Sequence, residues 1–187
     1  MGTWIVLGIV VLAVLVVVWM YNRLVRLKYQ VTNGWGQIDV QLKRRHDLIP
    51  NLVNTVRGAM EYERETLERV VQARSAAMGA RGTAEVAAKE GALSGALSKL
   101  FVVLEQYPQL RATENVRALQ EELSHTENQI GFARQFYNDV VTQFNTALET
   151  FPTNVLAGMF QFRPADLFQI TVAGEREVPQ VDLRLRA

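Results

Sequence analysis

The sequence contains no cysteine and only two histidines, His46 and His125. Without cysteine the chain has no disulfide, no thiolate nucleophile and no cysteine metal site. The HExxH pattern of zinc proteases is absent, and Asp47 cannot share a helix face with His46 as an i, i+4 residue would. We therefore expect neither a metal site nor a bound cofactor.

Recognisable catalytic motifs are missing as well. There is no GxSxG nucleophile elbow, and no glycine-rich phosphate loop follows a predicted strand. The acidic residues between Glu61 and Glu68 are interleaved with Arg64 and Arg69, which is typical of a solvated helix face with weak ion pairs. The sequence therefore does not predict an enzyme.

A strong excess of positive charge is also lacking. The net charge is +1, and residues 22–81 contribute +5 whereas residues 82–187 contribute −4. Nucleic-acid binding proteins usually carry a larger and more clustered basic excess, so no nucleic-acid partner is expected. The basic part instead suits anionic lipid headgroups or the acidic half of the same chain.

Charged side chains are absent from residues 1–22, which contain the apolar run WIVLGIVVLAVLVVVWMY from Trp4 to Tyr21. As a helix this run is about 27 Å long, close to the ~30 Å hydrocarbon core of a bilayer. Trp4 at one end, and Trp19 with Tyr21 at the other, suit the two headgroup regions. No basic segment precedes the run and no A-x-A-like cleavage site follows it, so the pattern predicts an uncleaved transmembrane anchor, with membrane lipid as its partner.

Basic residues follow the anchor immediately, at Arg23, Arg26 and Lys28. Because positively charged flanks stay on the cytoplasmic side, we expect a single-pass protein whose C-terminal part is cytoplasmic.

Helical periodicity dominates the chain after the anchor. The first stripe of apolar residues stays in phase across Pro50 and comprises Trp35, Ile38, Leu42, Ile49, Leu52 and Val56, followed by Leu67, Val70 and Val71. A break near His46 and Asp47, with Pro50 in the first turn of a new helix, is the favoured interpretation. A helix that continues through Pro50 with a kink is the alternative.

Three later segments complete the predicted fold. Gly79 or Gly82 ends the first helical region, a helix over residues 84–107 stops before Pro108, and a last long helix runs from about Thr113 to Phe151. Its buried stripe is Leu119, Leu123, Ile130, Ala133, Val140, Phe144 and Leu148. The fold class is therefore all-α: an anchor leading into an elongated antiparallel bundle of long helices, four if the chain breaks near His46 and three if it does not.

The predicted boundaries are an anchor over 1–22, a helical bundle over 23–151 and a C-terminal region over 152–187 with short helical and extended parts. From about Gly174 onward, charge and proline suggest a mobile or strand-like tail.

Some charged residues fall within the apolar stripes. A buried charge is costly unless it is paired, so we expect a polar network that fixes the register of the helices or, alternatively, a polar surface that receives a partner. Its candidate members are Asp39, Arg45, Glu127 and Arg134.

Residues 38–53, which read IDVQLKRRHDLIPNLV, resemble the LemA family of bacterial membrane proteins. His46 stands where that family commonly has tyrosine, and Tyr62 where it commonly has histidine. The resemblance implies an N-terminal anchor in the bacterial inner membrane and a bundle of long antiparallel helices. It does not imply an activity, because the family has no established enzymatic reaction. It extends to the segments NRLV (22–25), ERETL (63–67), ARS (73–75), LEQYP (104–108), TEN (126–128), ARQFYN (133–138) and FPTN (151–154).

The favoured function is a membrane-anchored, non-enzymatic scaffold or adaptor that self-associates or docks other membrane proteins. A homo-oligomer is expected, with Met159, Phe160 and Phe162 as candidate contact residues. A signalling or sensor component that relays a change between anchor and bundle is the alternative. An enzyme, such as a hydrolase using the Glu61–Glu68 face, is the third.

Overall fold

The structure is a computed structural model and describes residues 1–169. These residues form helices and no strands. The four long helices are α1 (Gly2–Val56), α2 (Arg64–Gly79), α3 (Thr83–Leu104) and α5 (Glu114–Glu149). Three short elements lie between or after them: η1 (Glu61–Glu63), α4 (Pro108–Arg111) and α6 (Thr153–Met159). The expected tail beyond Gly174 lies outside the described residues.

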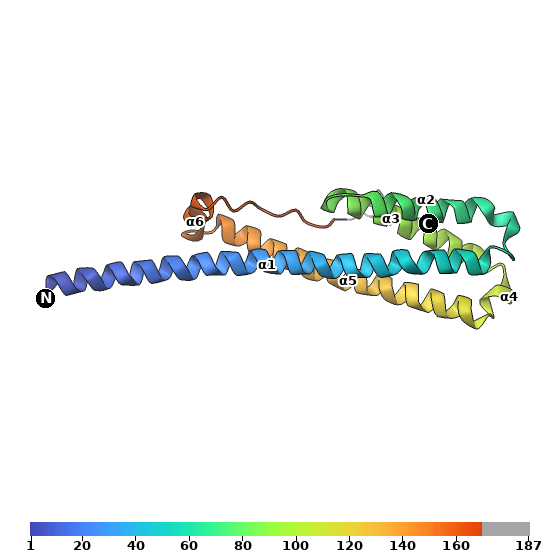
Figure 1. Cartoon of the computed structure of the whole chain (residues 1–187), viewed down its shortest axis with the longest axis horizontal. Helices are drawn as coiled ribbons and strands as arrows, with labels where there is room; N and C mark the ends of the chain where they lie inside the picture. The colour runs from blue at the N-terminus through green and yellow to red at the C-terminus, as the bar shows by residue number, and fades with distance from the viewer. Residues whose placement is uncertain (170–187) are drawn as a thin grey trace, which may run out of the picture.

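The long helices run alternately up and down in an elongated bundle (Figure 1). The second half of α1 packs antiparallel against α5, and α2 and α3 form a hairpin beside them. The first part of α1 extends alone beyond the bundle. The prediction of an all-α fold with an N-terminal apolar helix leading into an antiparallel bundle is therefore confirmed.

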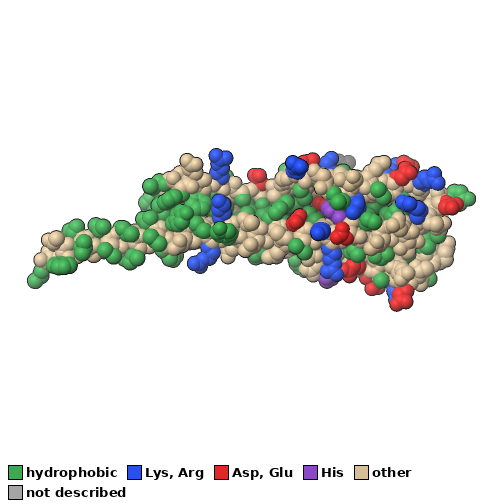
Figure 2. Space-filling model, viewed as in Figure 1, with side chains coloured by type: hydrophobic (Ala, Val, Ile, Leu, Met, Phe, Trp, Pro, Cys, Tyr) green, Lys and Arg blue, Asp and Glu red, His purple; other side chains and the backbone are tan. Residues whose placement is uncertain are grey.

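The free part of α1 is apolar and uncovered. Every side chain from Met1 to Trp19 is exposed, and Figure 2 shows hydrophobic but no charged side chains along this projection. Its mean hydropathy over 18 residues is 2.8, and it is the one described helix long and apolar enough to cross a membrane. So much exposed apolar surface is stable only where something other than water covers it.

Helix α1 does not break near His46, so the favoured position of the break was wrong and the alternative of a continuous helix holds. Pro50 lies inside α1, which ends at Val56. The residues that pass through this region on the buried face, including Leu42, Ile49 and Leu52, remain fully packed. Their burial outweighs the loss of one helical hydrogen bond at the proline.

The real turn in the chain lies between Val56 and Arg64, where no stop was predicted. Met60, in the middle of this turn, is completely buried, and its amide donates to the Val56 carbonyl at 3.1 Å. The turn is therefore part of the core, and the bundle has four long helices because the chain reverses here. The next turn agrees with expectation: α2 ends at Gly79, and Gly82 has a φ of +77° that favours glycine.

Apolar residues form three clusters along the bundle. The cluster farthest from the anchor surrounds Ile49 and Leu100, a middle cluster surrounds Ile38 and Ile130, and a small one near the anchor includes Leu24. Of the predicted α5 stripe, five residues are buried and Leu119 and Leu148 are partly buried, whereas Val71 on α2 is exposed.

The extended segment after α6 is held against α5 by side-chain amides. Asn138 accepts from the Phe168 amide at 2.8 Å and donates to its carbonyl at 3.1 Å. Asn145, seven residues along the same face, does the same with Ala165, both at 2.9 Å. The Tyr137 hydroxyl donates to the Asp166 carbonyl at 2.8 Å. Burial raises the pKa of this phenol, and the Asp166 charge raises it further, so Tyr137 remains a donor at neutral pH.

Candidate functional site

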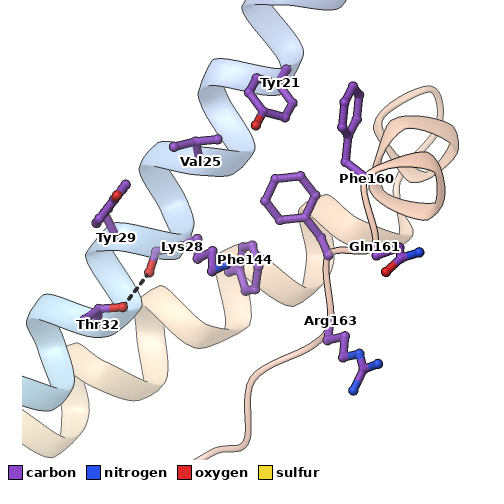
Figure 3. A pocket seen from close by; sticks show the side chains of 10 residues that line it. Tyr21, Val25, Lys28, Tyr29, Thr32, Phe144, Phe160, Gln161 and Arg163 are labelled. Carbon is purple, nitrogen blue, oxygen red and sulfur yellow. Dashed lines mark hydrogen bonds between the residues drawn. The ribbon is translucent and has the colours of Figure 1, made fainter.

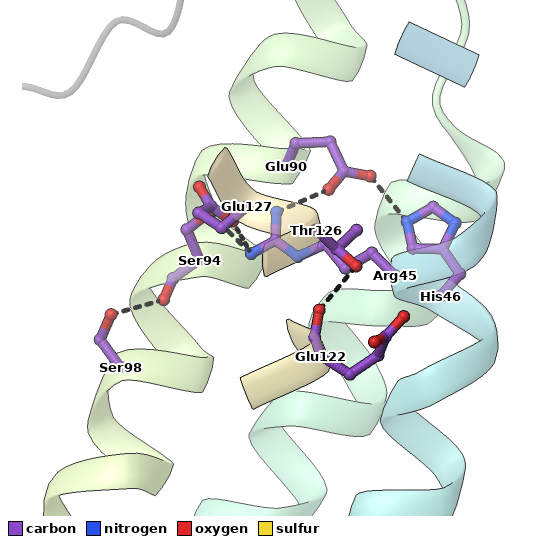
Figure 4. A network of polar contacts seen from close by, with 8 residues as sticks. All are labelled: Arg45, His46, Glu90, Ser94, Ser98, Glu122, Thr126 and Glu127. Atoms are coloured by element: carbon purple, nitrogen blue, oxygen red, sulfur yellow. Dashed lines mark hydrogen bonds and ion pairs between the residues drawn. The ribbon is translucent and has the colours of Figure 1, made fainter. Parts of the chain in front are cut away.

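A polar cluster is buried in the bundle between the middle and the far apolar clusters (Figure 4). Its centre is Glu90 of α3, whose side chain is 3% exposed. The Glu90 carboxylate accepts from Nε2 of His46 at 2.7 Å and from Nη1 of Arg45 at 3.3 Å. One buried carboxylate thus accepts hydrogen bonds from two neighbouring residues of α1. This pairing offsets the free-energy cost of burying the charges.

The same guanidinium connects α1 to α5. Nη2 of Arg45 lies 3.0 Å from Oε2 of Glu127 and donates to the Ser94 hydroxyl at 2.8 Å. Ser94 in turn donates to Oε1 of Glu127 at 3.3 Å. The Glu127 side chain is 49% exposed, whereas the Glu90 side chain is 3% exposed. The cluster is therefore buried at Glu90 and open to solvent at Glu127.

Helix α2 joins the cluster through the Arg74 side chain, which contacts the backbone of α1. Pro50 has no N–H, so the carbonyl of His46, four residues earlier, receives no helical hydrogen bond. Nε of Arg74 donates to this carbonyl at 2.6 Å. All four long helices therefore contribute to one polar layer, which we call the polar cluster: Arg45, His46, Arg74, Glu90, Ser94 and Glu127.

Of the four residues proposed for a polar network, the structure brings together Arg45 and Glu127 only. Asp39 is exposed, because it lies about 120° around α1 from Arg45 at 100° per residue. Arg134 shares the face of Glu127 but lies about 10 Å further along α5, and it makes no ion pair with another residue of 1–169.

Glu90 was not among the predicted members, although it is the most buried acid of the cluster. It lies in phase with Val86, Leu93 and Leu97, all buried on α3. That phase is the available signal. It was obscured because ten of the 22 positions of this helix are Ala, Gly, Ser or Thr, and no single face stands out in the sequence.

The arrangement provides charge pairing. The Ser94 hydroxyl accepts from Arg45 and donates to the Glu127 carboxylate, and it contacts no histidine of the described residues. Within residues 1–169 no three acidic or histidine side chains are grouped to hold a metal ion. A polar layer of this kind can fix the register of the helices, because sliding any helix by one turn would leave buried charges without partners.

A second feature is an apolar surface between α1 and α5, formed by Val40, Phe132 and Phe136, which we call the α1–α5 patch. These side chains line a shallow groove of about 560 Å³. Phe132 is 67% exposed and Val40 63%. Oε1 of Gln41, in the wall of the groove, is buried and accepts no hydrogen bond from a described residue.

The predicted aromatic residues gather where α1 enters the bundle. The ring of Tyr21 lies 4.7 Å from that of Phe160 and 6.0 Å from that of Phe162. Phe162 is half-buried against Phe144 of α5, whereas Met159 and Phe160 are exposed. Trp4 and Trp19 are exposed on the projecting part of α1, and Arg23 lies over the Trp19 ring at 5.8 Å.

The fold and these sites define a helical-bundle protein with one N-terminal apolar helix of membrane-spanning length. The model of the LemA family matches residues 34–183, so the chain belongs to the LemA family. It is similar to Protein LemA of Metamycoplasma hominis, with 28% identity over 87% of this chain and 72% of that protein.

Part of the chain is also similar to proteins of magnetosomes. Magnetosome protein MamQ 2 of Paramagnetospirillum magneticum is 29% identical over 48% of this chain, and Magnetosome protein MamQ of Magnetospirillum gryphiswaldense is 26% identical over 49%. The matched regions cover about a third of each of those proteins, 33% and 35%.

Proposed function

We propose that the protein is a membrane-anchored, non-enzymatic scaffold whose bundle associates side by side with further copies or with other membrane proteins. The α1–α5 patch is the observation that carries this proposal. Val40, Phe132 and Phe136 form one exposed apolar surface rather than isolated side chains; such patches mark interaction sites, and aromatic residues are enriched in protein interfaces.

The position of the α1–α5 patch along α1 favours a protein rather than a lipid as its partner. Val40 follows Tyr21 by 19 residues of unbroken helix, or about 29 Å. That distance is well beyond the headgroup layer when Tyr21 lies at the membrane surface.

Anchoring favours a second copy of the same chain. Copies in one membrane share one orientation, so a two-fold axis along the membrane normal brings each α1–α5 patch against its equivalent at the same height. Confinement to a plane also raises the effective concentration for weak lateral contacts. The proposal includes the bacterial inner membrane as the location and the cytoplasm as the side of the bundle, on the basis of the basic residues after Tyr21.

Sedimentation of the full chain in mild detergent tests this proposal. We expect a multimer, and we expect residues 24–187 alone to be mainly monomeric. Phe132→Glu combined with Phe136→Glu should convert the full chain to monomers, because burying a charge in the contact is costly. Val102→Glu, at an apolar position on α3 that is 61% exposed against 67% for Phe132, is the control for an added surface charge and should leave the multimer intact.

A full chain that stays monomeric over a wide concentration range would remove the basis for self-association and favour an adaptor that binds a different partner. Equal losses in the α3 control would mean that added charge, rather than the α1–α5 patch, breaks the assembly.

A sensor that relays a change between anchor and bundle is the second candidate. The continuity of α1 favours it, since a rotation or tilt of the anchor is transmitted directly into the polar cluster at Arg45 and His46. Charge substitutions in the polar cluster that alter the exposure of the helices without altering assembly would support this second function.

A further inference from the structure

A groove lies between α1 and the segment that follows α6, close to the point where α1 leaves the apolar run (Figure 3). It has a volume of about 540 Å³, within the ~300–1,000 Å³ typical of small-molecule sites. Its walls include Tyr21 and Lys28 of α1, and Phe160, Phe162 and Arg163 from the C-terminal side.

The height of this groove is set by the anchor. Tyr21 ends the uncharged run and so lies in the headgroup region of the membrane. Because the Phe160 ring packs against Tyr21 at a tilt of 57°, the end of α6 is at the same level. The exposed apolar side chains of α6 and its end, Val155 and Met159 among them, then contact lipid rather than water.

The groove changes character along its length. Figure 3 shows the rings of Tyr21 and Phe160 at the end toward the anchor and Arg163 at the opposite end. Lys28 belongs to the basic side, with its ammonium 6.0 Å from the centre of the Phe162 ring. No acidic residue lines the groove, and neither Lys28 nor Arg163 forms an ion pair with another residue of 1–169.

Lys28 is within reach of a headgroup. It lies about 10 Å beyond Tyr21 along α1, but helical side chains lean back over the preceding turn of about 5 Å. The ammonium is therefore near the level of the lipid phosphates, on the basic side of a groove whose apolar side faces the acyl region.

We propose that this groove binds one anionic phospholipid, with its phosphodiester between Lys28 and Arg163 and its acyl chains passing Tyr21 and Phe160 into the bilayer. Figure 3 shows Arg163 pointing away from Lys28, so this exposed side chain must turn toward the groove for both cations to donate charge-assisted hydrogen bonds to phosphate oxygens. The aromatic rings cover the glycerol and upper acyl carbons. The bound lipid would fill the space between α1 and the segment after α6, and so fix how the bundle stands on the membrane.

Native mass spectrometry of the full chain released from detergent with phosphatidylglycerol or phosphatidylcholine tests the proposal. We expect one retained phosphatidylglycerol per chain and much weaker retention of phosphatidylcholine. The double variant Lys28→Gln/Arg163→Gln should reduce phosphatidylglycerol retention roughly 25-fold, at about five-fold for each basic residue near a membrane surface.

The matched control is the double variant Arg23→Gln/Arg26→Gln. It removes the same charge at nearly the same height, but these residues lie about 140° and 160° around α1 from Lys28 and do not line the groove. Its retention should stay within about two-fold of the unmodified chain if the site is the groove rather than general basic charge.

Two further measurements separate a lipid from a free phosphate ligand. Phe160→Ser should weaken phosphatidylglycerol retention several-fold without any change of charge, and excess inorganic phosphate should not displace the lipid. Equal losses in both double variants, no preference over phosphatidylcholine, or displacement by phosphate would each overturn the proposal. Far-ultraviolet circular dichroism of each variant confirms that the bundle remains folded.

Discussion

Glu90 is the residue on which the polar cluster depends. Its carboxylate pairs with both Arg45 and His46, and Glu90 is the least exposed residue of the polar cluster, with 2% of the whole residue accessible to solvent. The more exposed pair between Arg44 of α1 and Glu122 of α5 offers a direct contrast. Burial, rather than the number of charges, decides how much each pair matters.

Glu90→Ala should lower the free energy of unfolding by about 3–5 kcal/mol, because the buried Arg45 guanidinium loses a partner. Glu122→Ala is the control and should cost less than about 1 kcal/mol, since exposed pairs contribute little. Chemical denaturation of the full chain in detergent micelles, followed by circular dichroism, measures both. Similar small losses in the two variants would mean that water reaches the polar cluster.

At the scale of elements, α1 shows how a proline is accommodated inside a long helix. The carbonyl left without a helical donor by Pro50 accepts from Arg74, a residue of a different helix. The His46 carbonyl needs Arg74 as a donor only because Pro50 supplies none. Substitutions of Pro50 and Arg74 should therefore be energetically coupled.

A double-mutant cycle checks this coupling. Arg74→Met should cost about 1–3 kcal/mol in the unmodified chain, because the carbonyl loses its donor. In a Pro50→Ala background the new amide replaces that donor, so Arg74→Met should cost less than about 1 kcal/mol. Arg69→Met, on the exposed face of α2, is the control and should change stability little in either background. Equal costs of Arg74→Met in both backgrounds would contradict the coupling.

Pro50 also shows which parts of the fold were predictable from sequence. The length of the uncharged run located the anchor, glycine located the turn at Gly79–Gly82, and apolar periodicity located α5, because each signal lies in residues close together in the chain. Whether the chain continues through Pro50 depends on a donor 24 residues later, and whether it turns at Met60 depends on a buried site built by other helices. Local pattern carries neither kind of information.

The residues of the candidate sites also divide into those that local sequence pattern predicts and those that it does not. Arg45 stood out because a charge interrupted a clear apolar stripe, whereas Glu90 lay in a helix of small residues with no contrasting face. Tyr21, Phe160 and Phe162 were singled out separately, as anchor end and as contact residues. Only the folded chain shows that they share one groove.

On the scale of the whole molecule, one helix sets the relation of every site to the membrane. The groove at Tyr21, the α1–α5 patch at Val40 and the polar cluster at Arg45 follow one another along α1. All three therefore lie on the same side of the membrane, and the orientation of the anchor decides which compartment they face.

That orientation can be measured by labelling single cysteines. The chain has no cysteine of its own, so the unmodified protein serves as the unlabelled control. Tyr62→Cys introduces a thiol at a fully exposed position at the far end of the bundle, and Thr3→Cys introduces one before the apolar run. If the bundle is cytoplasmic, as proposed from Arg23, Arg26 and Lys28, a membrane-impermeant maleimide should label Thr3→Cys in intact spheroplasts and Tyr62→Cys only after lysis. Labelling of Tyr62→Cys before lysis, with Thr3→Cys protected, would reverse the orientation. The groove would then face the outer leaflet and the α1–α5 patch would lie outside the cell membrane.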